Sequence, residues 1–186
     1  MKKVSFAFLL VAGLAISASA QEAKKEKTVM VGGAEMYPSK NIVENAVNSA
    51  DHTTLVAAVK AAGLVETLQS AGPFTVFAPS NAAFGLLPEG TVETLVKPEN
   101  KGTLTSILTY HVVPGRLDSK ELTKLIKKGN GTTELKTVAG GKLWVMAKGN
   151  EIWIKDEKGG TAQVAISDVY QSNGVIHSID HVLMPK

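Results

Sequence analysis

The chain has 186 residues, a formal net charge of +3 at pH 7 and no cysteine. The lack of cysteine excludes disulfides, thiol catalysis, cysteine-ligated zinc and iron–sulfur clusters. Two of the surplus lysines, Lys2 and Lys3, lie in a segment that we expect to be removed, which lowers the charge to about +1 and weakens the case for nucleic-acid binding.

Residues 1–20 have the three-part layout of a secretory signal peptide. Two early lysines are followed by an apolar run over 6–16 and by the small residues Ala18-Ser19-Ala20. The run is too short to span a bilayer, which takes about 20 residues. We therefore expect cleavage after Ala20 and a secreted or periplasmic chain without a membrane span.

The next part of the chain, 21–38, is interpreted as a flexible leader and N-terminal arm, because its first residues are charged and rich in alanine. Apolar residues then recur at helical spacing. "FTVFA" (74–78) predicts a short buried strand, and Ser80 behind it is a favourable N-cap. Helices are predicted around 41–50, 55–59, 64–68, 81–87, 91–96, 100–108 and 118–129.

From Thr133 onward the apolar residues alternate with a period of two, which indicates strands. "KLWVMAK" and "EIWIK", separated by Gly149-Asn150, predict a hairpin with a tryptophan on each arm, Trp144 facing Trp153. A core position is expected for the two indoles, and an exposed pair would instead stack on sugar rings or contact a protein. Helices in the first half and strands in the second predict an α+β domain.

Three stretches in order carry a family resemblance: "TVFAPSNAAF" (75–84), "LTYHVVPG" (108–115) and "NGVIHSIDHVLMP" (173–185). The first and third resemble the two signature segments of the fasciclin domain, and the second resembles the tyrosine–histidine segment between them. The resemblance covers 39–186. It implies a wedge-shaped β-sandwich of about seven strands with several helices packed alongside.

The resemblance also implies a role in extracellular adhesion and interaction rather than catalysis. In animal members the tyrosine–histidine segment and an Asp-Ile pair are implicated in adhesion, and the second pair is matched here by Asp-Val. The positions in this chain that match these two motifs are Leu108, Tyr110, His111, Val112, Val113, Asp168 and Val169. These are the candidate partner-binding residues.

His111 can have a structural role, contact a partner or take part in catalysis, and its expected position helps to decide among these roles. As a helical residue it falls on the stripe of Leu104 and Ile107, and as a strand residue it shares a face with Val113 while Tyr110 takes the other. At least one of the pair is thus expected inside, where an imidazole is normally hydrogen-bonded. A structural role is favoured over partner contact, and partner contact over catalysis.

No cofactor, metal or catalytic site is predicted. His177 and His181 are about 13 Å apart if they lie on one strand, too far to share an ion. Ser80, Asp180 and a histidine do not make a hydrolytic motif, since no G-x-S-x-G occurs. The glycine pairs lack the phosphate-loop pattern.

The sequence therefore predicts a non-enzymatic binding module that mediates adhesion or interaction with a protein or matrix polysaccharide. A basic helix face at Lys120, Lys124, Lys127 and Lys128 is interpreted as a solvated surface or a weak contact for an acidic polymer. Weak self-association is also considered. The alternative function is a carrier or sensor of a small apolar ligand held between the sheet and the helices.

Overall fold

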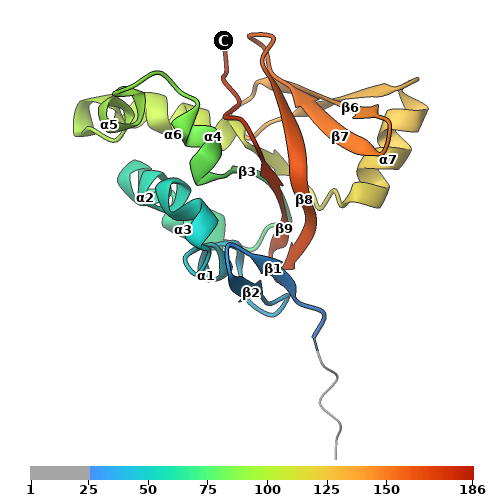
Figure 1. The fold of residues 1–186 in the computed structure, drawn as a ribbon, viewed down its shortest axis with the longest axis horizontal. Helices are drawn as coiled ribbons and strands as arrows, with labels where there is room; N and C mark the ends of the chain where they lie inside the picture. The colour runs from blue at the N-terminus through green and yellow to red at the C-terminus, as the bar shows by residue number, and fades with distance from the viewer. Residues whose placement is uncertain (1–25) are drawn as a thin grey trace, which may run out of the picture.

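The computed structural model of the chain describes residues 26–186, so the expected signal peptide lies outside the described residues. Helices cover one side of a sheet, and α7 packs beside the β6–β7 hairpin at the other end (Figure 1). The helices of this part are α1 (Ile42–Ala46), α2 (Thr53–Ala62), α3 (Val65–Gln69), α4 (Asn81–Gly85), α5 (Thr91–Leu95), α6 (Lys101–Tyr110) and α7 (Ser119–Lys128), with the 3₁₀ turns η1 (Ala50–His52) and η2 (Pro98–Asn100).

Seven strands of the described residues form one sheet in the order β4-β3-β9-β8-β7-β6-β5, and β1 and β2 form a separate hairpin. The strands are β1 (Val29–Val31), β2 (Ala34–Met36), β3 (Phe74–Pro79), β4 (Val112–Pro114), β5 (Thr132–Lys136), β6 (Lys142–Lys148), β7 (Glu151–Lys155), β8 (Thr161–Gln171) and β9 (Gly174–Ile179). Only the β3–β9 pair of this sheet is parallel.

The wedge shape comes from β8, which belongs to both layers of the fold. Its first residues pair with β7, and its later residues pair with β9 after register shifts between Val164 and Val169. Such bulges bend a strand and increase its twist. The predicted α+β class and wedge-shaped sandwich of about seven strands are confirmed, and the two layers are the two ends of one bent sheet.

Side-chain caps begin several helices where the sequence indicates them. Asn41 makes a capping box with Glu44, Ser80 accepts a hydrogen bond from the Ala83 N–H, and Asp118 accepts one from the Glu121 N–H. Gly90 occupies the N-cap position of α5, where no side chain caps the helix. The first predicted helix is also shorter than expected and ends at Ala46.

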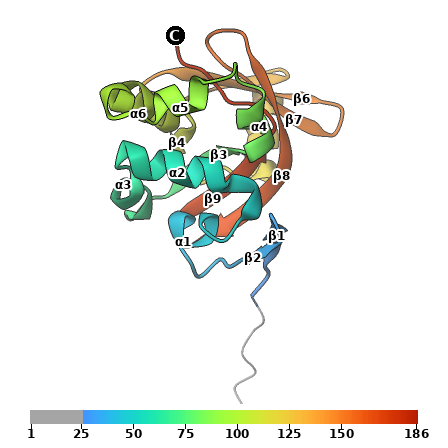
Figure 2. The same ribbon diagram turned by 60° about the vertical axis from the view of Figure 1, so that its left-hand side comes forward.

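The sheet separates two apolar cores because β3 is buried on both faces. Val76 and Ala78 belong to the core beneath α1–α6, whereas Phe77 packs mainly in the core shared by α7 and the β6–β7 hairpin and also borders the first core. Figure 2 shows α2 and α3 lying across β3 and β9, which places the first core between helices and sheet. Because successive side chains of a strand point to opposite faces, β3 contributes residues to both cores.

The β1–β2 hairpin is attached to this body through a buried amide. Val31 and Met36 enter the helix-side core, and Asn45 accepts a hydrogen bond from the Tyr37 N–H at 2.9 Å. The same side chain donates to Tyr37 O and to the buried Gln171 side chain. No helix within residues 26–186 is long and apolar enough to cross a bilayer.

Candidate functional site

Tyr110 ends α6 and is fully buried. Its hydroxyl donates to Lys142 O at 2.6 Å and accepts from the Glu157 N–H at 3.0 Å, so one side chain joins α6 to β6 and to the β7–β8 turn. Burial raises the pKa of Tyr110 to about 12. Gly141 lies against the ring, since a Cβ there would come within 2.7 Å of it. The phenol is a structural hydrogen-bonding group.

His111 is only 2 % exposed and also points inward. Nε2 accepts the Leu183 N–H at 2.9 Å, so the proton lies on Nδ1, which donates to Ile107 O at 2.8 Å. Desolvation lowers the pKa of His111 to about 4, and the ring is neutral near pH 7. The imidazole therefore attaches the C-terminal segment to the end of α6.

The whole tyrosine–histidine segment is interior. Its apolar members Leu108, Val112 and Val113 are 5 %, 6 % and 3 % exposed. We expected at least one of Tyr110 and His111 to point inward, and both do. Contact with a partner through this segment stays a prediction, because it requires these side chains to leave their packed positions.

The second motif is also a structural junction. Val169 is buried, and Asp168 adopts the left-handed region at φ 60 within the β8 irregularity. Its carboxylate accepts the Ser119 N–H at 2.7 Å and the Ser119 hydroxyl at 2.5 Å, at the start of α7. The Asp168 N–H donates to His177 Nδ1, whose Nε2–H donates to Leu117 O at 2.8 Å.

The other histidines do not share a face as the sequence suggested. His177 lies within β9 and is buried, whereas His181 follows the end of that strand, is exposed and pairs with Asp180 at 2.9 Å. Among residues 26–186, no cluster of three or more His, Cys, Asp or Glu could hold a metal ion. Nothing on this part of the chain thus assembles a metal centre from the candidate histidines.

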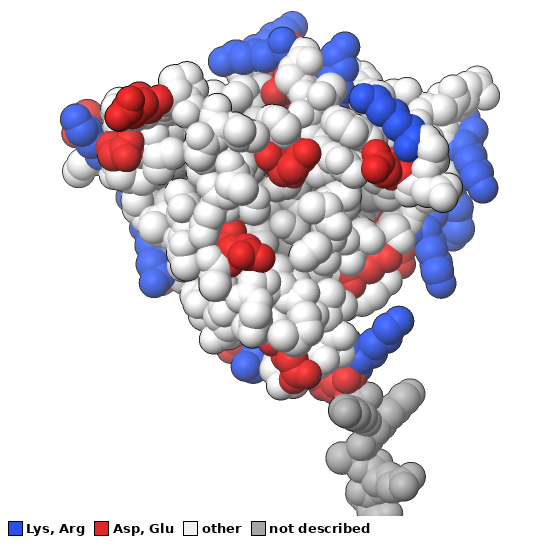
Figure 3. All heavy atoms as spheres, viewed as in Figure 1, with Lys and Arg blue, Asp and Glu red and all other residues white. Residues whose placement is uncertain are grey.

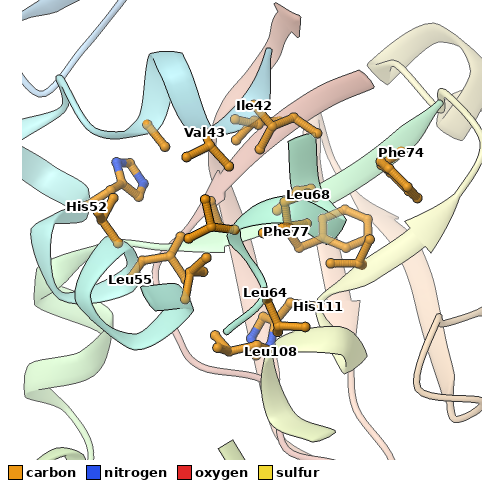
Figure 4. A pocket seen from close by; sticks show the side chains of 18 of the residues that line it. Ile42, Val43, His52, Leu55, Leu64, Leu68, Phe74, Phe77, Leu108 and His111 are labelled. Carbon is orange, nitrogen blue, oxygen red and sulfur yellow. The ribbon is translucent and has the colours of Figure 1, made fainter. Parts of the chain in front are cut away.

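An apolar cavity of about 80 Å³ lies between the helices and the sheet (Figure 4). Side chains from α1, α2, α3, β3 and α6 point into it. The carrier alternative expected a ligand at this place between sheet and helices, but the sequence did not name the lining residues because these elements are far apart along the chain. The labelled lining residues are Ile42, Val43, His52, Leu55, Leu64, Leu68, Phe74, Phe77, Leu108 and His111. A water needs about 10–15 Å³, so the space is large enough for a small hydrocarbon group.

The polar groups in the cavity wall are already occupied. His52 hydrogen-bonds to Ser49 Oγ at 2.9 Å and to Ser178 Oγ at 3.0 Å, and burial lowers the pKa of His52. Polar atoms contribute almost nothing to the cavity surface. The hydroxyl–imidazole contacts resemble part of a hydrolytic dyad, but the partner of Nδ1 is a hydroxyl instead of a carboxylate, and the wall offers almost no donors to an oxyanion.

The two tryptophans lie on the outer face of the sheet, and the expected core position is wrong. The register pairs Trp144 with Lys155 and Met146 with Trp153, so the indoles are diagonal neighbours instead of facing each other. Both are half-buried, because Leu143 and Val145 take the inner positions of the same strand. The predicted alternation of the strand is confirmed, but the prediction placed the tryptophan face inside, whereas the face of Leu143 and Val145 packs inward.

A polar rim surrounds this outer face, which we define by Trp144, Met146 and Trp153. Lys148 Nζ stands 3.9 Å from the Trp153 ring centroid, and the Trp153 indole N–H donates to Glu151 at 3.0 Å. Lys142 pairs with Glu134 beside Trp144. Figure 3 shows the side of the molecule seen in Figure 1 as a broad uncharged surface with isolated acids and with lysines along its margins.

The comparisons with known proteins agree on one family. The family model described as "Fasciclin domain" matches residues 50–185. "Protein sll1483" of Synechocystis is 44% identical over 173 residues, covering 93% of this chain and 89% of its own length. "Cell surface glycolipoprotein MPB83" of Mycobacterium bovis is 36% identical over 122 residues, covering 66% of this chain and 48% of its own length.

A solved structure supports the fold independently of sequence. The chain superposes on a FAS1 domain pair of the insect cell adhesion molecule fasciclin I with a TM-score of 0.70 and 18% identity. The match covers 86% of this chain and 58% of that one. At this identity the likeness concerns the fold alone.

Tyr110→Phe is expected to lower the free energy of unfolding by about 1–3 kcal/mol, because it removes two hydrogen bonds of a fully buried side chain and leaves the part-buried Lys142 O and Glu157 N–H without their partner. Urea unfolding measures this. Tyr37→Phe is the matched control, since the Tyr37 hydroxyl bonds to Glu35 at the surface, and it should change stability by less than about 0.5 kcal/mol. Equal effects of both variants would contradict a structural role for the Tyr110 hydroxyl.

The free energy of unfolding is expected to decrease as the pH falls below 6.5. The His111 imidazole has a pKa of about 4 in the folded state and about 6.5 in the unfolded state, so between these values only the unfolded state binds the proton. At 1.36 kcal/mol per pKa unit, His111 alone accounts for about 3 kcal/mol lost between these values. Protonation of His52 and His177 acts in the same direction. Unfolding at successive pH values should show a shallower fall for His111→Gln and an unchanged fall for His181→Gln, whose side chain is exposed.

Proposed function

The chain belongs to the fasciclin domain family, and from that premise we propose that it is an extracellular, non-catalytic binding domain that mediates adhesion to a protein or polysaccharide surface. The proposal is supported by one relative described as a cell surface glycolipoprotein. Residues 1–20 serve as the signal peptide, 21–38 as leader and arm, and 39–186 as the fasciclin domain.

The observation that carries this proposal is the outer face. Its half-buried Trp144, Met146 and Trp153 are large apolar groups on a surface strand pair, rimmed by charged side chains that are paired or solvated. Aromatic residues within a polar rim are typical of binding hot spots. The interior tyrosine–histidine and Asp168-Val169 motifs keep the two layers in register, and direct contact of these residues with the partner stays a prediction.

Adhesion can be measured with beads coated with the purified chain and washed over collagen, alginate and the chain itself. We expect retention on at least one coating, and a loss of about fivefold for Trp153→Ala, the effect of removing a modest hot spot. Lys155→Glu alters the same face at an exposed position without touching the core, and it should also change retention. Leu86→Ala, at a side chain 63% exposed elsewhere, is the control. Retention on no coating, or equal retention of all variants, would reject the proposal.

The apolar cavity favours a second candidate function, the carriage of a small apolar ligand. Its wall is built almost wholly from carbon, and it lies within the helix-side core. At about 80 Å³ it has roughly half of the volume of an engineered cavity that binds benzene. Sites for small molecules are mostly concave, apolar and preformed, and this space has all three properties.

Binding of 1-hexanol, followed by shifts of backbone amide NMR signals, tests this second function. Ala46→Leu adds a larger side chain at a lining position and is expected to abolish the shifts without lowering the melting temperature. Val47→Leu is its matched control, because the neighbouring Val47 is 48% exposed and does not line the cavity. If hexanol leaves the cavity residues unshifted, the carrier function is contradicted.

A further inference from the structure

The lining of the apolar cavity reaches solvent at its exposed residues. The exposed members of its lining are Lys60, Thr67 and Val138. Lys60 precedes Leu64 by one turn at the end of α2, and Figure 4 shows Leu64 gathered with Leu108 and His111 at one end of the space. The opening therefore lies beside the turn that joins α2 to α3.

This opening is positively charged, whereas the interior is neutral. Lys60 is the one side chain with a formal charge in the lining formed by the described residues, and it has no ion pair among them. A second cation stands close, because Lys101 Nζ lies 3.2 Å from the position that a Cβ on Gly63 would take. The lowered pKa values of His52 and His111 keep both imidazoles uncharged inside.

An apolar interior with cations at its opening selects a particular chemistry. A wholly apolar ligand would gain nothing from Lys60, and a cationic ligand would be repelled by both lysines. An acidic group remains in water at the opening and pairs there with the ammonium groups, while its hydrocarbon part enters the cavity. Every buried side-chain nitrogen and oxygen in the described part of the fold already has a hydrogen-bond partner, so no side chain inside requires a polar ligand group.

We propose that the cavity binds a single-chain carboxylic acid, with the alkyl group between α1–α3 and β3 and the carboxylate at Lys60 and Lys101. The inference rests on the carrier function and adds its ligand class. The alkyl chain is short or only partly inserted, because about 80 Å³ accommodates a few carbon atoms. The two lysines make the site selective for an acidic head group, and burial of the ligand's alkyl group provides most of the affinity.

The test compares three probes with the same six-carbon chain, hexanoate, 1-hexanol and hexyltrimethylammonium, titrated into the full chain at pH 7.5 and low salt. Hexanoate should shift the amide signals of Leu64 and His111, and hexyltrimethylammonium should bind most weakly. Lys60→Met is expected to weaken hexanoate about threefold, the effect of one exposed ion pair, and to leave hexanol unchanged. Raising the salt to about 0.15 M should weaken hexanoate alone.

Lys97→Met is the matched control, because Lys97 is exposed and does not line the cavity. Equal binding of hexanoate and hexyltrimethylammonium, or the same loss of hexanoate and hexanol in Lys60→Met, would overturn the head-group assignment while leaving the carrier function intact. If none of the three probes binds at the cavity, both the carrier function and this inference fail. The adhesion proposal is independent of each outcome.

Discussion

The hydrogen bonds of two adjacent side chains, Tyr110 and His111, hold the layers of this domain together. Tyr110 connects the end of α6 to β6 and to the β7–β8 turn, and His111 connects the same helix end to the C-terminal segment. The hydrogen bonds of His111 are buried and those of Tyr110 are part-buried, and a buried polar group without a partner costs about 1–3 kcal/mol. Consequently the two groups and the four segments they join must be placed together, and the helices cannot shift along the sheet independently.

Much of the architecture could be predicted from the sequence because local rules decide it. The cap at Ser80, the start of α7 at Asp118 and the strand around Phe77 each follow from neighbouring residues. Asn45 carried a usable signal that was missed, since a polar residue on the apolar stripe of a helix calls for a buried partner, here Tyr37 and Gln171.

What could not be predicted depends on distant parts of the chain. The alternation in β6 is equally regular with Trp144 inside or outside, and only the packing of α7 against Leu143 and Val145 decides between them. The volume and lining of the cavity depend even more on distant residues, because they are determined by the relative positions of α1, α2, α3, β3 and α6. At about 24 cal/mol per Å³, a void of this size costs about 2 kcal/mol, so anything that fills it would stabilise the fold.

The parallel pairing of β9 with β3 has a mechanical consequence. The described residues begin at one end of the molecule and finish at the opposite end, with β9 running toward the C-terminus between β3 and β8 (Figure 1). Tension between the two ends would pull β9 lengthwise, so its hydrogen bonds to both neighbours would be loaded in shear and share the force instead of opening one after another. A domain anchored at one end and gripped at the other would therefore yield slowly, and its lifetime under load would be set by the rate of forced unfolding.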